Sequence, residues 1–280
     1  MKVGVVGLGT MGAGIAQVSV TAGHETVGRE VELPLAERGR ATIERYLGRA
    51  VEKERMTTGE RDAAVARLTL TTELAALADC DLVVEAIVEE LEAKRALFAE
   101  LDAITRPDAV LATNTSALSV SEIAEATARP ERVVGMHFFN PAPVLPLVEI
   151  VRGERSSDEA VEKAYAWAEH AGKRPVRCND TPGFIVNRIL IPLLNDCVRV
   201  LDEAGVTPAD LDKAMTNGAG WPMGPCALVD LVGIDIHVHA SQALHAKLGE
   251  DRVAPPERLL AMQAEGKLGR KSGEGFYTYS

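Results

Sequence analysis

The first thirty residues carry the clearest chemical pattern of the chain. A β-branched run at residues 2–6 leads into the glycine-rich turn 7–12, GLGTMG, and a helical pattern begins directly after it. Gly7 would make the tight turn, Gly9 would let the backbone approach a pyrophosphate, and Gly12 would let helix and strand pack closely. The helix N-terminus favours the anion. This context predicts a dinucleotide site, and the alternative is a plain tight turn of an α/β protein.

Glu30 follows the second extended run, residues 25–29. A carboxylate at this place accepts hydrogen bonds from a ribose diol and repels a 2′-phosphate, so the sequence predicts NAD rather than NADP as the cofactor. Arg29 directly precedes it, and an arginine there can accept that phosphate.

A second group of polar side chains lies where predicted strands end. His137 closes the strand RVVGMHF beside the proline-rich loop NPAP, and Glu149 lies in the next extended segment. A carboxylate on one imidazole nitrogen fixes the ring tautomer and makes the other nitrogen a better base for a hydroxyl proton. A core histidine bonded to the backbone is the alternative for His137. The other polar residues at predicted strand ends are Glu85, Glu89, Asn114, Thr115 and Ser116.

Strand and helix patterns alternate along the first part of the chain, and only helices follow before the tail. The predicted strands are 2–6, 25–29, 68–71, 81–86, 109–113, 132–138, 147–151 and 175–178. This order predicts an α/β fold, with an N-terminal Rossmann-like doubly wound parallel sheet at 1–181 and a C-terminal all-α domain at 182–280. Ligands of such sheets bind outside the carboxyl ends of the strands.

Two helical segments have two possible interpretations each. Residues 31–67 are helical and strongly charged, which we interpret as a solvated face, with a helical excursion that covers a ligand as the alternative. A long helix is predicted over 184–204, where apolar residues recur at helical spacing. These residues could face a second subunit or pack only within their own: Ile185, Ile189, Leu193 and Leu194.

Composition limits the class of protein. The chain has 280 residues and a formal net charge of −11, which argues against nucleic acid as a general partner. Its four cysteines are scattered, with neither the spacing of metal ligands nor the density of a disulfide scaffold, and no metal site is predicted. No signal peptide and no membrane-spanning run is recognised, so we expect a soluble cytoplasmic protein.

Six sequence blocks together resemble the 3-hydroxyacyl-CoA dehydrogenase family, in its short 3-hydroxybutyryl-CoA dehydrogenase type. The blocks, in the family's order, are GLGTMGAGIAQ, TNTSALSVSEIA, GMHFFNPAPVLPLVEIV, PGFIVNRILIPLLN, WPMGP and LGRKSGEGFYTY. The resemblance implies a Rossmann domain, a helical dimerisation domain and a homodimer. It also implies NAD-linked interconversion of a short (S)-3-hydroxyacyl-CoA and its 3-oxo form, in fatty acid metabolism.

The resemblance also implies roles for single residues. The catalytic set is His137 as base, Glu149 as its partner, Ser116 at the substrate hydroxyl, and Asn187 as a group that polarises the substrate. The substrate-binding positions are Ser116, Asn187 and, for the CoA moiety, Lys53. The cofactor positions are Gly7, Leu8, Gly9, Thr10, Met11, Gly12, Glu30, Glu89, Lys94, Asn114, Ser116, Asn140 and Lys271.

Three departures from the family leave alternatives open. Glu30 replaces the usual aspartate, Gly28 stands where the family has a bulky apolar residue, and Tyr46 stands where many relatives have a small polar residue near the CoA adenylate. The acyl carrier could therefore be free CoA or a carrier protein. A dehydrogenase of another 3-hydroxy acid, such as a sugar acid, and a non-catalytic dinucleotide-binding protein are the competing interpretations.

Overall fold

The computed structural model describes residues 1–279. The chain divides into two compact units, Met1–Thr181 and a second unit that begins at Pro182. Each unit has its own buried core.

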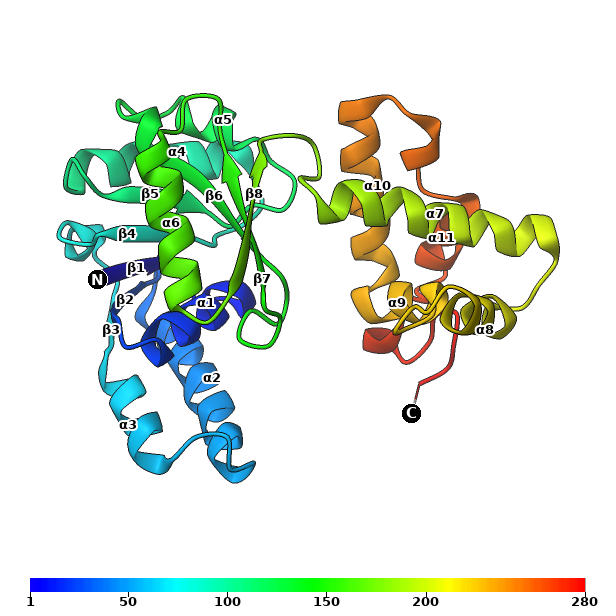
Figure 1. The fold of residues 1–280 in the computed structure, drawn as a ribbon, viewed down its shortest axis with the longest axis horizontal. Coiled ribbons are helices and arrows are strands. Elements are labelled where there is room, and N and C mark those ends of the chain that lie inside the picture. The colour runs from blue at the N-terminus through cyan, green and yellow to red at the C-terminus, as the bar shows by residue number, and fades with distance from the viewer. Residues whose placement is uncertain (280) are drawn as a thin grey trace. The chain divides into compact units, whose positions relative to one another are not determined.

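The first unit is built around one eight-stranded sheet (Figure 1). Its strand order is β3-β2-β1-β4-β5-β6-β7-β8, so after β3 at one edge the chain returns to the middle of the sheet and places β4 beside β1. The strands are β1 (Lys2–Val6), β2 (Glu25–Arg29), β3 (Leu68–Thr71), β4 (Leu82–Glu85), β5 (Val110–Thr113), β6 (Val133–Phe138), β7 (Leu147–Arg152) and β8 (Arg174–Asn179). The helices are α1 (Thr10–Thr21), α2 (Leu33–Glu52), α3 (Thr58–Ala66), α4 (Leu91–Ile104), α5 (Val120–Ala124) and α6 (Asp158–His170).

One strand pair departs from the predicted parallel sheet. All neighbouring strands run parallel except β6 and β7, which are antiparallel. Residues 139–146 join these two strands without a helix, whereas a parallel connection needs a crossover of a dozen or more residues. The predicted Rossmann-like fold class is otherwise confirmed.

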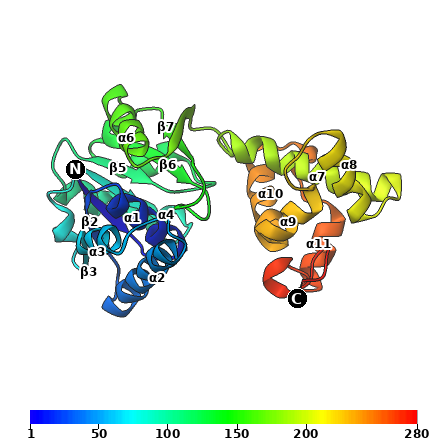
Figure 2. The same ribbon diagram turned by 60° about the horizontal axis from the view of Figure 1, so that its bottom comes forward.

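Both faces of the sheet are covered. Helices α1 and α6 contribute to one continuous apolar core with the strands, in which Trp167 is the largest buried side chain. Helix α6 lies against β5 and β6 (Figure 2). Helices α4 and α5 pack against each other, and α4 also contacts β5 and α5 contacts β6. The central strands are therefore buried on both faces, which explains their unbroken apolar sequences.

The second unit is helical. It consists of α7 (Val186–Ala204), α8 (Pro208–Gly218), α9 (Pro225–Val232), α10 (Ile234–Leu248) and α11 (Glu257–Ala264). Helix α7 begins two residues later than predicted, because Gly183 and Phe184 both have positive φ angles, 79° and 50°, and so reverse the chain before the helix. The core joins α7, α9, α10 and α11 through Leu194, Val198, Val229, Ile234, Val238 and Leu259.

Two carboxylates hold the C-terminal tail onto the helical unit. Asp230 is buried and accepts hydrogen bonds from the backbone N–H groups of Phe276 and Tyr277, at 2.9 and 3.0 Å, and from the Tyr279 hydroxyl at 2.9 Å. Asp212 accepts the Tyr277 hydroxyl at 2.7 Å. The tail is thus an integral part of this unit's packing.

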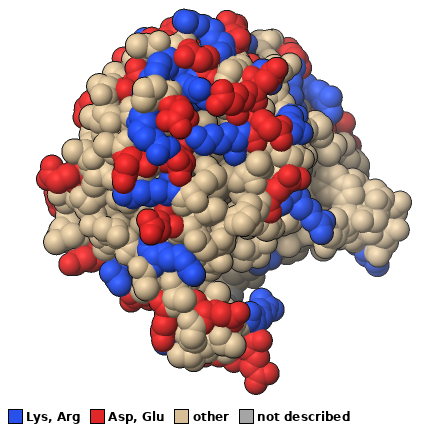
Figure 3. Space-filling model, turned by 60° about the vertical axis from the view of Figure 1, so that its left-hand side comes forward, with Lys and Arg blue, Asp and Glu red and all other residues tan. Residues whose placement is uncertain are grey.

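The surface mixes both signs of charge. On the face drawn in Figure 3, acidic and basic side chains are interspersed, so opposite charges offset each other at short range. No helix among residues 1–279 is long and apolar enough to cross a bilayer.

A buried histidine anchors α10 to α7. The Nε2 atom of His237 lies 2.8 Å from Asn195 Oδ1, and Asn195 Nδ2 donates to the Val253 carbonyl at 2.9 Å. Burial lowers the pKa of His237 to about 4, because the charged imidazolium would be desolvated. The ring therefore stays neutral in the folded unit at pH values where an unfolded histidine is protonated.

This difference predicts acid sensitivity of the helical unit. The native ring stays neutral down to about pH 4, so the unfolded chain binds more protons below about pH 6.5, and stability should fall by roughly 3 kcal/mol between pH 7 and 4. This loss of stability is measured by urea unfolding at several pH values, monitored by Trp221 fluorescence in a Trp167→Phe background. His237→Gln keeps a donor for Asn195 without titrating, so its stability should depend less on pH. Identical pH slopes for the two proteins would contradict this assignment.

Candidate active site

The glycine-rich turn leaves β1 and opens α1 at the middle of the sheet. A Cβ atom on Gly12 would collide with the Gly7 carbonyl oxygen, so this close packing of helix against turn requires glycine. A Cβ on Gly9 would meet no atom within 4 Å, so there is open space beside the helix N-terminus. Gly9 is the N-cap and gives α1 no side-chain hydrogen bond. Backbone N–H groups next to open space fit a dinucleotide pyrophosphate.

Glu30 bends back over this turn. Its Oε1 atom accepts the Leu8 N–H at 2.6 Å, and its Oε2 atom accepts the Val31 N–H at 3.1 Å. The neighbouring Arg29 is engaged elsewhere, since its Nε donates to the Thr72 carbonyl at 3.2 Å. The carboxylate rather than the guanidinium is therefore the charge presented at the end of β2.

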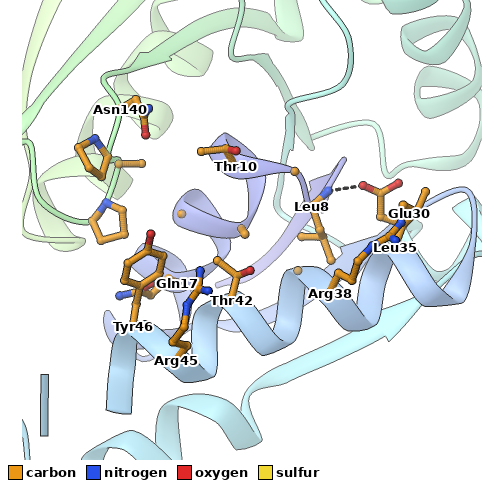
Figure 4. A pocket seen from close by; sticks show the side chains of 17 residues that line it. Leu8, Thr10, Gln17, Glu30, Leu35, Arg38, Thr42, Arg45, Tyr46 and Asn140 are labelled. Atoms are coloured by element: carbon orange, nitrogen blue, oxygen red, sulfur yellow. Dashed lines mark hydrogen bonds between the residues drawn. The ribbon is translucent and has the colours of Figure 1, made fainter. Parts of the chain in front are cut away.

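A cavity of about 510 Å³ lies between the turn, α2 and the loop after β6 (Figure 4). The turn contributes Leu8, Gly9 and Thr10, and the loop contributes residues 140–143. Helix α2 lines the opposite wall with Leu35, Arg38, Gly39, Thr42, Arg45 and Tyr46. The charged segment that we interpreted as a solvated face thus has one side toward a cavity, which favours the alternative that it covers a ligand. Met11 instead packs against the core.

His137 and Glu149 form a buried pair on the antiparallel strands β6 and β7. They are directly opposite in the register, and His137 Nδ1 lies 2.6 Å from Glu149 Oε2. Their relative exposures are 5 % and 0 %, so water competes little for this contact. The Phe139 ring lies 4.5 Å from the imidazole ring and restricts its orientation further. The pairing expected from the sequence is present, and the alternative of a histidine bonded only to backbone does not hold.

A buried ion pair supports the turns after β4 and β5. Glu85 Oε1 accepts Lys94 Nζ at 2.5 Å, and Glu85 Oε2 accepts the Thr113 hydroxyl at 2.7 Å. Lys94 Nζ also lies 3.3 Å from Glu89 Oε2, and its side chain is only 1 % exposed. The Lys94 ammonium thus faces two carboxylates rather than solvent, and its predicted contact with the cofactor stays a prediction.

Glu89 in turn fixes the segment that carries Ser116. One oxygen, Oε1, accepts the Thr115 hydroxyl at 2.5 Å, the Ser116 N–H at 2.8 Å and the Ala117 N–H at 3.1 Å. Burial acts to raise the pKa of Glu89, but the Lys94 ammonium and these hydrogen bonds outweigh it and hold the pKa below its ordinary value. Glu89 is therefore a stable anion that ties two strand ends together.

The loop after β6 is held from two sides. Asn114 Oδ1 accepts the Phe138 N–H at 3.0 Å, which links the ends of β5 and β6. Lys173, which the sequence did not single out, donates from Nζ to the carbonyls of Ala142 and Leu145 at 2.5 and 3.1 Å. Burial lowers the pKa of Lys173. These contacts fix the loop in which Asn140 lines the cavity.

The remaining predicted residues lie apart from these groups along the chain. Lys53 is the exposed C-cap of α2. In the helical unit, Asn187 lies in the first turn of α7, and Lys271 Nζ lies 2.5 Å from Asp235 Oδ1. Their predicted roles stay predictions. The sequence analysis missed Arg38, Thr42 and Arg45, whose helical spacing on the side of Tyr46 was the available signal.

Family models match both units of the chain. The family model of the 3-hydroxyacyl-CoA dehydrogenase NAD binding domain matches residues 2–181, and that of the C-terminal domain matches residues 183–279. The chain belongs to the 3-hydroxyacyl-CoA dehydrogenase family. It is thus an oxidoreductase family member with an NAD-binding Rossmann-type domain, and the predicted cofactor NAD is confirmed.

Several relatives match over nearly their whole length. The chain is 43 % identical to a probable 3-hydroxybutyryl-CoA dehydrogenase of Deinococcus radiodurans, covering 100 % of both chains. It is 46 % identical to the 3-hydroxybutyryl-CoA dehydrogenase of Mycobacterium tuberculosis, covering 99 % and 98 %. The crystal structure of (S)-3-hydroxybutyryl-CoA dehydrogenase PaaH1 from Ralstonia eutropha superimposes with a TM-score of 0.96 at 37 % identity, covering 100 % and 99 %.

The position of Glu30 predicts strong discrimination between the two dinucleotides. Glu30→Ala should weaken NADH binding about tenfold or more, because hydrogen bonds to a charged group are lost. NADPH binding should weaken much less, since the like charge facing its 2′-phosphate disappears. Fluorescence titration gives both dissociation constants, with Glu32→Ala as the control, an exposed residue that makes no capping hydrogen bond. Tighter binding of NADPH than NADH by the unmodified protein would refute this assignment.

Proposed function

We propose that this protein interconverts (S)-3-hydroxybutyryl-CoA and acetoacetyl-CoA with NAD. The observation that carries the proposal is the buried His137–Glu149 pair, 2.6 Å apart, in the same unit as the dinucleotide turn. An imidazole oriented by a carboxylate is the group that hydroxyl oxidation requires. The names of the relatives support the substrate class.

The proposed reaction assigns one proton to the protein. Glu149 holds Nδ1, so Nε2 of His137 takes the proton of the 3-hydroxyl group as the carbon–oxygen double bond forms. When bound, NAD supplies the acceptor for the hydrogen that leaves C3 with its electron pair. In reduction the imidazolium returns its proton to the oxygen. We assign Ser116 to the substrate hydroxyl, and Asn187 to the polarisation of the substrate.

Residues of α2 favour CoA as the carrier of the acyl group. Arg45, Arg49 and Lys53 follow each other at one-turn spacing, beside Tyr46. The guanidinium carbons of Arg45 and Arg49 lie 5.3 and 5.8 Å from the Tyr46 ring centroid. Cations grouped around an aromatic ring suit a phosphorylated adenosine, which CoA carries and pantetheine lacks.

Turnover measured with a panel of substrates tests this proposal directly. NADH oxidation should be fast with acetoacetyl-CoA, while acetoacetyl-pantetheine should show a KM higher by about tenfold or more. Arg45→Ala should raise the KM for the CoA thioester alone, and Arg61→Ala on α3 is the matched control. A carrier-protein thioester, keto sugar acids and 3-oxoadipyl-CoA complete the panel. The last is included because a 3-hydroxyadipyl-CoA dehydrogenase of Escherichia coli is 41 % identical over 278 residues.

Each outcome of the panel separates the competing functions. A preference for sugar acids, or for the carrier-protein thioester, would replace the CoA assignment. No turnover with any substrate, together with tight NADH binding, would identify a non-catalytic dinucleotide-binding protein.

The base is tested by its removal. His137→Ala should lower turnover by about 10²–10⁴-fold, the usual contribution of general acid–base catalysis. NADH affinity should change little, because the dinucleotide turn follows a different strand. Glu149→Gln should reduce turnover less, since the base remains but its tautomer is no longer fixed. His170→Ala, on the exposed end of α6, is the control. A loss of NADH affinity equal to the loss of rate would make His137 a structural residue.

The helical unit is proposed to form a homodimer. Ile189 is 61 % exposed and Ile236 is 53 % exposed, whereas Leu194 of the predicted stripe packs inside its own unit. Exposed apolar side chains of this size favour a partner. Light scattering at micromolar concentration should give twice the chain mass, Ile189→Glu should lower it, and Val176→Glu in β8 should not. A monomeric mass for the unmodified protein would exclude the dimer.

We further propose a cytoplasmic role in short-chain fatty acid metabolism.

A further inference from the structure

Leu8 of the glycine-rich turn occupies a slot between two glycines of other elements. A Cβ atom on Gly28 in β2 would lie 2.8 Å from Leu8 Cδ1, and one on Gly39 in α2 would lie 2.6 Å from Leu8 Cβ. Leu8 is only 4 % exposed. Its side chain therefore fills space that a bulky residue at position 28 would otherwise occupy, which explains the unusual glycine in that strand.

The turn cannot move away from α2. On its other side, a Cβ on Gly7 would lie 2.7 Å from the Ala86 carbonyl oxygen, which follows β4. On the α2 side, the Gly39 Cβ would also lie 2.9 Å from the Leu8 carbonyl oxygen. Backbone therefore blocks the turn on both sides, and any side chain at position 39 must displace α2 rather than the turn.

Helix α2 carries one wall of the cavity, so its distance from the turn sets the width of that cavity. Thr42, Arg45 and Tyr46 follow Gly39 on this wall (Figure 4). The Leu8 N–H also holds the Glu30 carboxylate at 2.6 Å. Leu8 thus connects the position of α2 with the position of the acid that selects the dinucleotide.

We propose that Gly39, through its contact with Leu8, is a positioning residue for the dinucleotide. Glycine in a helix interior is less favourable than alanine. At position 39 its lack of a side chain allows the close approach of α2 to the turn. At Gly48 in the same helix, a Cβ would meet no atom within 4 Å, so this second glycine has no such contact.

The two glycines of α2 make a matched pair for the test. Gly39→Ala should raise the dissociation constant for NADH by about tenfold, measured by fluorescence titration without substrate. It should also reduce the preference for NADH over NADPH, because Glu30 lies only three residues before α2 and is displaced together with that helix. Gly48→Ala should leave both quantities unchanged within about twofold. Equal effects of the two substitutions, or a lower melting temperature for Gly39→Ala with unchanged NADH affinity, would overturn the proposal.

A double-mutant cycle keeps the test decisive if Gly39→Ala folds poorly. Leu8→Gly removes the Cβ that the new methyl group would meet, so the effect of Gly39→Ala on NADH affinity should be smaller in that background. Additive effects would show that the two residues do not act through their contact. The inference rests on the NAD site and not on the proposed acyl-CoA substrate. Turnover of acetoacetyl-CoA by the unmodified protein tests that substrate separately.

Discussion

The antiparallel pairing of β6 and β7 is the constraint on which the proposed chemistry depends. A parallel neighbour would need a crossover helix, and its register would be set by that helix. The short connection instead places His137 directly opposite Glu149, where two buried side chains meet at 2.6 Å. A one-residue slip would turn the carboxylate to the other face of the sheet. The backbone ladder therefore specifies the His137–Glu149 contact, and the Lys173 contacts hold the loop between the two strands.

Two further carboxylates, those of Glu85 and Glu89, connect the ends of neighbouring strands. Glu85 joins β4 to β5 through Thr113 and to α4 through Lys94, and Glu89 extends the connection to the Ser116 segment. Charges as deeply buried as those of Glu85 and Lys94 are tolerated because each is paired and hydrogen-bonded. This arrangement leaves the backbone near the reacting atoms little freedom, which is what a hydride-transfer site requires.

Local sequence patterns predicted most elements, because period and turn chemistry are local properties. The predicted strands 132–138 and 147–151 correspond to Val133–Phe138 and Leu147–Arg152. The direction of β7 was missed, since periodicity carries no information on strand orientation. The glycine-rich turn, Glu30 and the His137–Glu149 pair were predictable from residue type and position. The roles of Lys173 and Gly39 were not predictable, because both residues contact groups that are distant in sequence. Lys173 binds carbonyl groups of the loop after β6, and Gly39 lies against Leu8.

The hydrogen bonds that hold the C-terminal tail on Asp230 and Asp212 affect the order in which the two units can fold during synthesis. The buried carboxylate of Asp230 accepts hydrogen bonds from N–H and hydroxyl groups of residues 276–279, and Asp212 accepts one more from the Tyr277 hydroxyl. Unpaired buried carboxylates are strongly unfavourable, so the helical unit cannot complete its core while those residues are still inside the ribosome. The sheet unit, whose strands are all translated by Asn179, has no such dependence. The order of synthesis therefore makes the nucleotide-binding half available to fold first, with the helical half completed only once residues 276–279 are also available.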